Sequence, residues 1–163
     1  MKYRIFVLWV LLPASTAQAE DWPQWRGPYF NGSTSEQGLP AEWSTTENIA
    51  WNARLPGTAA STPVVWDQLV FLSGVDGGRD VLQAMCFDRV SGDLLWSHDV
   101  AKGVRQDSRS NKASSSPATD GKQVYFFYGS GDLVCFDLDG GRRWARNLQQ
   151  DYGPLAFFWT FGG

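Results

Sequence analysis

The segments CFDRVSGDLLW at residues 86–96 and CFDLDGGRRW at residues 135–144 are near copies of each other. Both place a cysteine, an aspartate, a glycine and a tryptophan in the same order. The spacing extends toward the N-terminus, because Trp51, Trp96 and Trp144 are 45 and 48 residues apart. A period of roughly 40–50 residues is typical of propeller-like repeat folds. The sequence therefore predicts an internal repeat.

Each repeat is predicted to form four short strands. Runs rich in Val, Phe, Tyr and Trp, such as QLVFLSG at residues 68–74 and QVYFFYG at residues 123–129, are bounded by Gly, Asp and Ser. Four antiparallel strands in a repeat of this length make one blade of a β-propeller. We therefore predict an all-β fold, a partial β-propeller with about two blades and an N-terminal strand. The predicted division is a signal peptide at 1–19, a lead segment at 20–48 and repeats at 49–163, with a strand at 49–55, blades at about 60–100 and 115–149, and a third blade beginning at 154–163.

The repeated polar and aromatic residues have structural explanations. Asp88 follows the third strand and can cap backbone N–H groups of the turn. Gly92 can adopt the positive φ that the turn needs, and Trp96 offers a large ring to the neighbouring blade. The predicted structural blade-docking residues are Trp51, Asp88, Gly92, Trp96, Asp137, Gly141 and Trp144.

The spacing D-x-x-S-G-x-x-x-W, which ends at Trp96, resembles the tryptophan-docking motif of the pyrroloquinoline quinone (PQQ) repeat. Cys86 stands where that motif usually has alanine, and Ser91 where threonine is usual. The second copy is one residue shorter and departs further.

The lead is also similar to the start of exported bacterial PQQ-like propellers, in DWPQWRGPYFNG at residues 21–32 and GLPAEWSTTENIAWNARLPG at residues 38–57. That group includes relatives of the outer-membrane assembly lipoprotein and of the quinoprotein dehydrogenases. The resemblance covers residues 21–163 and implies a quinoprotein-dehydrogenase-like propeller fold more strongly than any activity.

The repeat count predicts an incomplete ring. Propellers close with roughly 4–8 blades, and the repeats present make about two. We therefore expect a truncated product, a fragment or one part of a split propeller, whose partners include the remaining blades or another chain. The alternative is a two-blade protein that assembles into a ring.

The first nineteen residues have the order of a secretory signal peptide. Lys2 and Arg4 precede an apolar run at residues 5–12, and small residues end at Ala19, after which cleavage is predicted. The run is shorter than the roughly 20 residues of a spanning helix, so we expect a periplasmic or secreted protein that does not span the membrane. An N-terminal membrane anchor is the alternative. The net charge of −3 does not favour nucleic acid as a partner.

Two function classes follow. The resemblance implies, as one hypothesis, a fragment of a PQQ-dependent alcohol or sugar dehydrogenase that uses PQQ with calcium and often carries adjacent cysteines. Cys86 and Cys135 are not adjacent and are predicted to be buried thiols, and His98, the single histidine, is predicted to be a half-exposed surface residue. We therefore favour a noncatalytic binding or scaffolding module without catalytic residue, metal or cofactor.

The candidate partner-binding surface is the longest insertion, at residues 101–116. Long loops on rigid sheets commonly carry recognition. The residues predicted to contact a protein or carbohydrate partner are Arg105, Arg109, Asn111 and Lys112. The alternative is a solvated connector.

Overall fold

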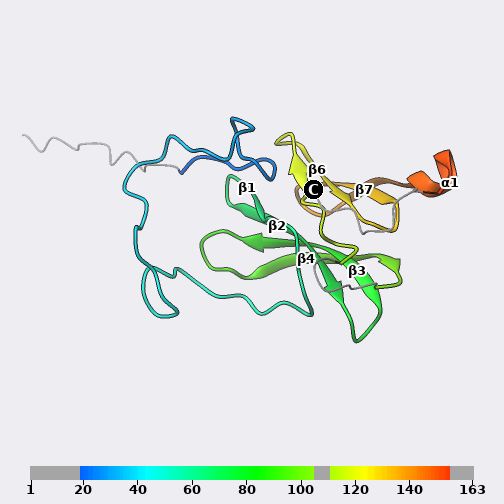
Figure 1. Ribbon diagram of the computed structural model, residues 1–163, viewed down its shortest axis with the longest axis horizontal. Helices are drawn as coiled ribbons and strands as arrows, with labels where there is room; N and C mark the ends of the chain where they lie inside the picture. The colour runs from blue at the N-terminus through cyan, green and yellow to red at the C-terminus, as the bar shows by residue number, and fades with distance from the viewer. Residues whose placement is uncertain (1–18, 105–110, 155–163) are drawn as a thin grey trace, which may run out of the picture.

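Two four-stranded antiparallel sheets make up the body of the protein (Figure 1). The computed structural model describes residues 19–104 and 111–154. Strand order follows chain order in both sheets, so each repeat is one four-stranded meander, and the predicted all-β class is confirmed. The first sheet contains β1 (Val64–Trp66), β2 (Leu69–Asp76), β3 (Val81–Asp88) and β4 (Leu94–Lys102), and the second contains β5 (Ala118–Thr119), β6 (Gln123–Phe127), β7 (Asp132–Asp137) and β8 (Arg142–Asn147).

The prediction of a strand at residues 49–55 is wrong, since this segment forms no β-ladder with another strand. Its burial nevertheless alternates, with Trp51, Ala53 and Leu55 partly buried and the residues between them exposed. An extended segment becomes a strand only when another strand satisfies its backbone groups. The alternating pattern thus predicted correctly which side chains of this segment are partly buried. Whether the segment forms a strand depended on a neighbouring strand, which the pattern does not reveal.

A short helix follows the second sheet. Helix α1 (Leu148–Tyr152) is capped by Asn147, whose side chain accepts hydrogen bonds from the backbone N–H groups of Gln149 and Gln150. The sequence did not predict this helix. Within the part of the chain that is described, no helix has the length and hydropathy to cross a membrane. Residues 1–18 of the predicted signal peptide and most of the predicted third blade lie outside the described residues.

The main core lies between the two sheets. Trp96 joins them, because its ring lies 6.0 Å from Phe71 of β2, 6.2 Å from Phe126 of β6 and 5.5 Å from Phe136 of β7, between ring centroids. Side chains that alternate along each strand supply the rest of this layer. The buried members are Val64, Phe71, Val75, Leu82, Ala84, Cys86, Ala113, Val124, Phe126, Tyr128, Val134 and Phe136.

A second core lies on the opposite face of the first sheet, where Leu72, Met85 and Phe87 are buried. Ala53, Leu55 and Ala59 pack on these residues, so the segment between the lead and β1 covers this face in place of a sheet. In Figure 1 the lead, blue to cyan, runs around the first sheet before it enters β1. The first blade is therefore covered on both faces.

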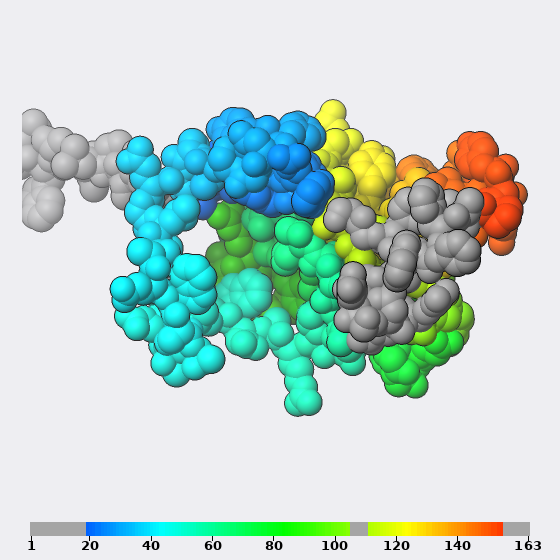
Figure 2. All heavy atoms as spheres, viewed as in Figure 1, coloured from blue at the N-terminus to red at the C-terminus, as the bar shows by residue number. Residues whose placement is uncertain are grey.

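The beginning of the lead holds the two blades together. Trp22 exchanges backbone hydrogen bonds with Val65 of β1, with N–O distances of 2.8 and 2.9 Å. The carbonyl of Pro23 accepts a hydrogen bond from the backbone N–H of Thr119 in β5 at 2.9 Å. Figure 2 shows this blue segment against the yellow residues of the second blade. The lead thus bridges the first strand of each sheet.

Candidate functional site

Trp51, just after the lead, docks on the turn that follows β3. Its indole Nε1 donates a hydrogen bond to the carbonyl of Arg89 at 2.7 Å. Gly92 has φ of 77°, and a Cβ at this position would lie 2.6 Å from the indole ring. The turn therefore needs glycine both for its left-handed backbone and for the close approach of the ring.

Trp96 of β4 docks on the second blade in the same way. Its Nε1 donates to the carbonyl of Leu138 at 3.0 Å, and its ring lies on Gly140, which has φ of 90°. The sequence prediction assigned this place to Gly141. Gly141 instead donates its N–H to the carboxylate of Asp137 at 2.6 Å. The missing residue of the second copy lies before the glycine, so counting four positions back from Trp144 would have found Gly140.

Both docking turns are held by the aspartate that begins them. Asp88 Oδ1 accepts backbone hydrogen bonds from Ser91 at 2.7 Å and Val90 at 2.9 Å. These bonds, that from Ser91 foremost, hold the pKa of Asp88 below its ordinary value. Asp137 forms an ion pair with Arg143 at 3.0 Å in addition to its bond with Gly141. The carboxylates thus stabilise turns.

Trp144, the third tryptophan of the series, is 39% exposed. Its ring contacts Tyr125 at 6.1 Å between centroids, and no glycine turn of the described chain lies against it.

The sequence analysis missed a further tryptophan–glycine contact. Trp66 at the end of β1 lies on Gly121 of the β5–β6 turn and leaves no room there for a side chain. Spacing gave no signal for it, because Trp66 has no counterpart in the second repeat.

The predicted partner-binding loop is described in part. Arg105 and Arg109 lie outside the described residues. Asn111 is 2% exposed, and its side-chain carbonyl accepts a hydrogen bond from the backbone of Ala113 at 2.9 Å. Its side chain therefore serves the turn and is not available at the surface. Lys112 is partly exposed.

The two cysteines are free and buried, as the sequence predicted. Burial raises the pKa of the Cys86 thiol to about 12 and also raises that of Cys135, so both remain thiols at neutral pH. In residues 19–104 and 111–154, no three His, Cys, Asp or Glu side chains are grouped closely enough to hold a metal ion.

His98 is more enclosed than predicted. Its ring stacks on Phe136 with centroids 4.8 Å apart and an interplanar angle of 10°, and it also contacts Trp96 at 5.4 Å. Its Nε2 is buried without a hydrogen-bond partner in the described chain. The residue therefore belongs to the interface between the blades.

A groove of about 450 Å³ separates the outer strands of the two blades. Its apolar lining comes from Val100, Val134, Phe136 and Ala145. Its charged lining comes from Asp99, Asp132, Arg142, Arg146 and Asp151. Arg146 and Asp151 form an ion pair at 2.9 Å, and Asp99 pairs with Arg79 at 2.7 Å, which leaves Asp132 and Arg142 as groove charges without an ion-pair partner among the described residues. We call it the inter-blade groove.

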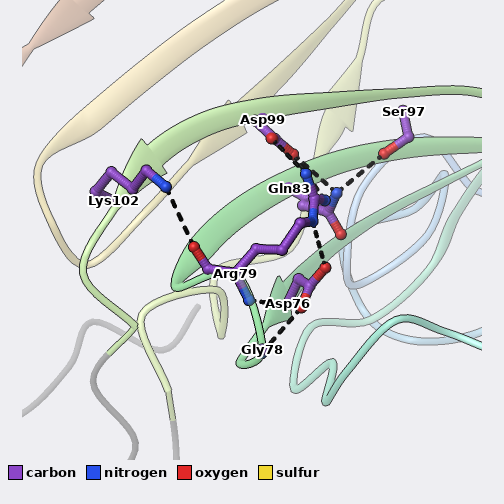
Figure 3. A network of polar contacts seen from close by, with 7 residues as sticks. All are labelled: Asp76, Gly78, Arg79, Gln83, Ser97, Asp99 and Lys102. Atoms are coloured by element: carbon purple, nitrogen blue, oxygen red, sulfur yellow. Dashed lines mark hydrogen bonds and ion pairs between the residues drawn. The ribbon is translucent and has the colours of Figure 1, made fainter.

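Around Asp99, which also lines the groove, a polar cluster surrounds Arg79 of the β2–β3 hairpin (Figure 3). Its guanidinium binds Asp76 at 2.7 Å and Asp99 at 2.7 and 3.1 Å. Gln83 donates to Asp99 at 2.9 Å. Burial opposes ionisation of Asp99, but the hydrogen bonds from Gln83 and Arg79 keep its pKa below the ordinary value. We define these four residues as the Arg79 cluster.

Many solved structures are similar to this chain, including the following two. BamB from Moraxella catarrhalis shares 18% identity over 60% of this chain and 26% of its own, with a TM-score of 0.46. Quinohemoprotein alcohol dehydrogenase from Comamonas testosteroni shares 19% identity over 84% of this chain and 21% of its own, with a TM-score of 0.53. The latter likeness supports the propeller fold alone. The chain spans about a quarter of either protein, and no curated protein matches it.

A family model decides membership. The model described as outer membrane protein assembly factor BamB matches residues 32–156, which is more than half of the chain. The match includes both copies of the repeat and the Trp51 segment that docks on the first blade. The predicted PQQ-like propeller resemblance is thereby confirmed, and the chain belongs to the PQQ-repeat β-propeller family of outer membrane protein assembly factor BamB.

Proposed function

We propose that this chain is a noncatalytic binding or scaffolding module that presents rigid blades to a protein partner in the cell envelope. The observation that carries the proposal is the repeated docking of Trp51 on Gly92 and of Trp96 on Gly140. Apart from Trp144, the repeated tryptophans and aspartates join blades or hold their turns, which supports a rigid surface more than a reaction centre. The name of the family, an assembly factor, agrees with this role.

The partner surface proposed from the sequence is the loop at residues 101–116, with Arg105, Arg109 and Lys112 as the cations predicted to contact the partner. A photo-crosslinker at position 112 should capture an envelope protein in the producing cell. Changing Arg105 and Arg109 to alanine in the chain that carries the crosslinker should reduce capture at least about fivefold, since each change removes a charge contact, while the unfolding midpoint stays unchanged. Unchanged capture by the alanine variant would exclude the loop as the partner surface.

Export is part of the proposal. Intact-mass measurement of the chain from the periplasm or medium should give a polypeptide that begins at Glu20. A chain that keeps residues 1–19 in the cytoplasm would contradict it.

The absence of a cofactor is likewise proposed. Addition of PQQ with calcium to the purified chain should leave the quinone absorbance unchanged and should give no dye-linked alcohol oxidation. A saturable spectral change with turnover would replace the binding function by the dehydrogenase hypothesis.

A further inference from the structure

The amide–carboxylate contact between Asn147 and Asp132 in the inter-blade groove has a counterpart in the first blade. Gln83 faces Asp99 across β3 and β4, and Asp132 faces Asn147 across β7 and β8. In each pair, the residue on the third strand of the blade lies three positions before the repeated cysteine: Gln83 before Cys86 in β3, and Asp132 before Cys135 in β7. Each is joined amide to carboxylate, at 2.9 Å from Gln83 to Asp99 and at 3.0 Å from Asn147 to Asp132. The same pair thus occurs twice, with amide and carboxylate exchanged between strands.

The first pair binds a guanidinium from the chain itself. Arg79 donates through both terminal nitrogens to Asp99, at 2.7 and 3.1 Å, and through Nε to Asp76 at 2.7 Å. Figure 3 shows the guanidinium beside Gln83 and Asp99. Two parallel N–H donors on one carboxylate make the strong, orientation-specific form of this interaction. The repeat therefore contains a working guanidinium site.

The second pair has no internal arginine because its hairpin is shorter. The β2–β3 ladder continues to the pair Asp76 and Val81, and Arg79 lies beyond it. The β6–β7 ladder ends at Phe127 and Leu133, next to Asp132 itself. Asp132 accepts hydrogen bonds from Ser130 and Asn147, and no cation of the described chain pairs with it.

The groove also offers a cation at its other end. Arg142 is exposed, lines the groove and has no partner among the described side chains. Arg142 is the cross-strand partner of Phe136 in β7. Phe136 lies four positions after Asp132, so the backbone positions of these two residues are about 13 Å apart in an extended strand. Between the two charges lie the apolar side chains of Val134 and Ala145. Apart from Asp99 of β4 and the Arg146–Asp151 ion pair, the lining along β7 and β8 is thus negative, apolar and positive in order.

We propose that the inter-blade groove binds an extended segment of a partner protein that carries an arginine, an apolar residue two positions later and an acidic residue four positions later. The arginine binds Asp132 as Arg79 binds Asp99, and the acidic residue pairs with Arg142. For a segment that runs parallel to β7, the spacing of four residues matches because an extended peptide has the same rise per residue as β7. The inference rests on the proposed binding function and gives it a partner chemistry.

The test uses the peptide Ser-Arg-Ser-Leu-Ser-Glu-Ser, blocked at both ends, titrated into the isotope-labelled full chain at low ionic strength. Amide resonances of β7 and β8 should shift saturably. Replacing the peptide arginine by citrulline, a neutral isostere, should weaken binding about tenfold, because a charge-assisted bidentate contact is lost. Replacing its glutamate by glutamine should weaken it by about fivefold or less, since Arg142 is exposed.

Matched variants locate the site. Asp132→Asn should bind the arginine and citrulline peptides equally, whereas Asp139→Asn, an exposed turn aspartate of the same blade, should keep the tenfold preference. Arg142→Ala should remove the preference for glutamate, and Arg143→Ala, on the same strand but outside the groove lining, should keep it. Ala145→Trp should abolish binding by filling an exposed groove position without disturbing the core.

The outcomes are separable from those of the proposed function. Absence of binding, equal affinity for arginine and citrulline peptides, or equal effects of Asp132→Asn and Asp139→Asn would overturn the groove proposal. Ala145→Trp guards against misfolding of the Asp132 variant, because its side chain is added at the surface. Partner capture through the 101–116 loop, measured on the loop variants, would remain as the test of the binding function.

Discussion

The adjacent glycines Gly140 and Gly141 provide a sharp test of blade docking, because alanine should be costly at one and mild at the other. At Gly140 the backbone has φ of 90°, where an L-residue costs about 1–2 kcal/mol. The added Cβ would lie 2.8 Å from Trp96 Cγ, so the indole must move. That movement weakens its hydrogen bond to Leu138, which contributes about 1 kcal/mol, and its ring contacts by a similar amount.

Gly140→Ala should therefore lower the free energy of unfolding by about 3 kcal/mol. At Gly141 the φ lies outside the left-handed region, and the Cβ would meet the end of the Asp137 carboxylate at 2.5 Å. That carboxylate can rotate away, so the expected loss is about 1 kcal/mol.

Urea unfolding followed by far-UV circular dichroism measures the difference. With a slope near 2 kcal/mol per molar, Gly140→Ala should unfold at about 1.5 M less urea than the parent chain. Indole fluorescence of the folded variant should also change, because Trp96 is displaced. Equal losses for the two variants, or a larger loss for Gly141→Ala, would refute the assignment of Gly140 as the docking glycine.

Three further predictions concern the same interfaces. Trp96→Ala should lower the free energy of unfolding by about 3–5 kcal/mol, and Trp144→Ala by less than about 1.5 kcal/mol, since only the former ring is packed between blades; equal losses in urea would contradict this. Asp88 has a lowered pKa when folded, so it stabilises the chain above its unfolded value of about 3.9 and loses that contribution as the pH falls through the folded value. The stability difference between the parent chain and Asp88→Asn should thus shrink with acidification, and a difference that grows would exclude the capping role. Because burial raises the pKa of Cys86 to about 12, an aromatic disulfide reagent should modify both thiols, Cys86 and Cys135, slowly in the folded chain and rapidly in urea; fast labelling of the folded chain would contradict their burial.

The sequence was sufficient for the blades because their signals are local. Alternating apolar residues and turn residues specify each hairpin, and the order of Asp88, Gly92 and Trp96 marks one docking turn. Repetition at a nearly constant spacing then predicted that successive blades dock alike. Trp51, Gly92 and Trp96 were identified correctly, whereas alignment from the aspartate chose Gly141 where the tryptophan spacing indicates Gly140. The docking of Trp66 on Gly121 was missed, and Trp144 docks on no glycine turn of the described residues.

The segment around Trp51 shows the limit of such patterns. Its alternation correctly gives the face on which Trp51, Ala53 and Leu55 lie, but a ladder requires backbone groups from elsewhere. Asn111 shows the same limit in the loop. A polar residue among serines suggested a surface contact, whereas the hydrogen bond to Ala113 and near-complete burial became visible only in the folded chain.

By itself the sequence determined the all-β repeat, the four-stranded blades and the docking of a tryptophan ring on a glycine turn of the next repeat. These features depend on side-chain periodicity and turn chemistry within each repeat. Only the tertiary structure decided that the lead bridges both blades, that Arg79 binds the carboxylate of the Gln83–Asp99 pair, and that the pair of Asp132 and Asn147 faces a groove. These features depend on hairpin length and on contacts between residues far apart in the chain, and local sequence patterns do not encode such distances.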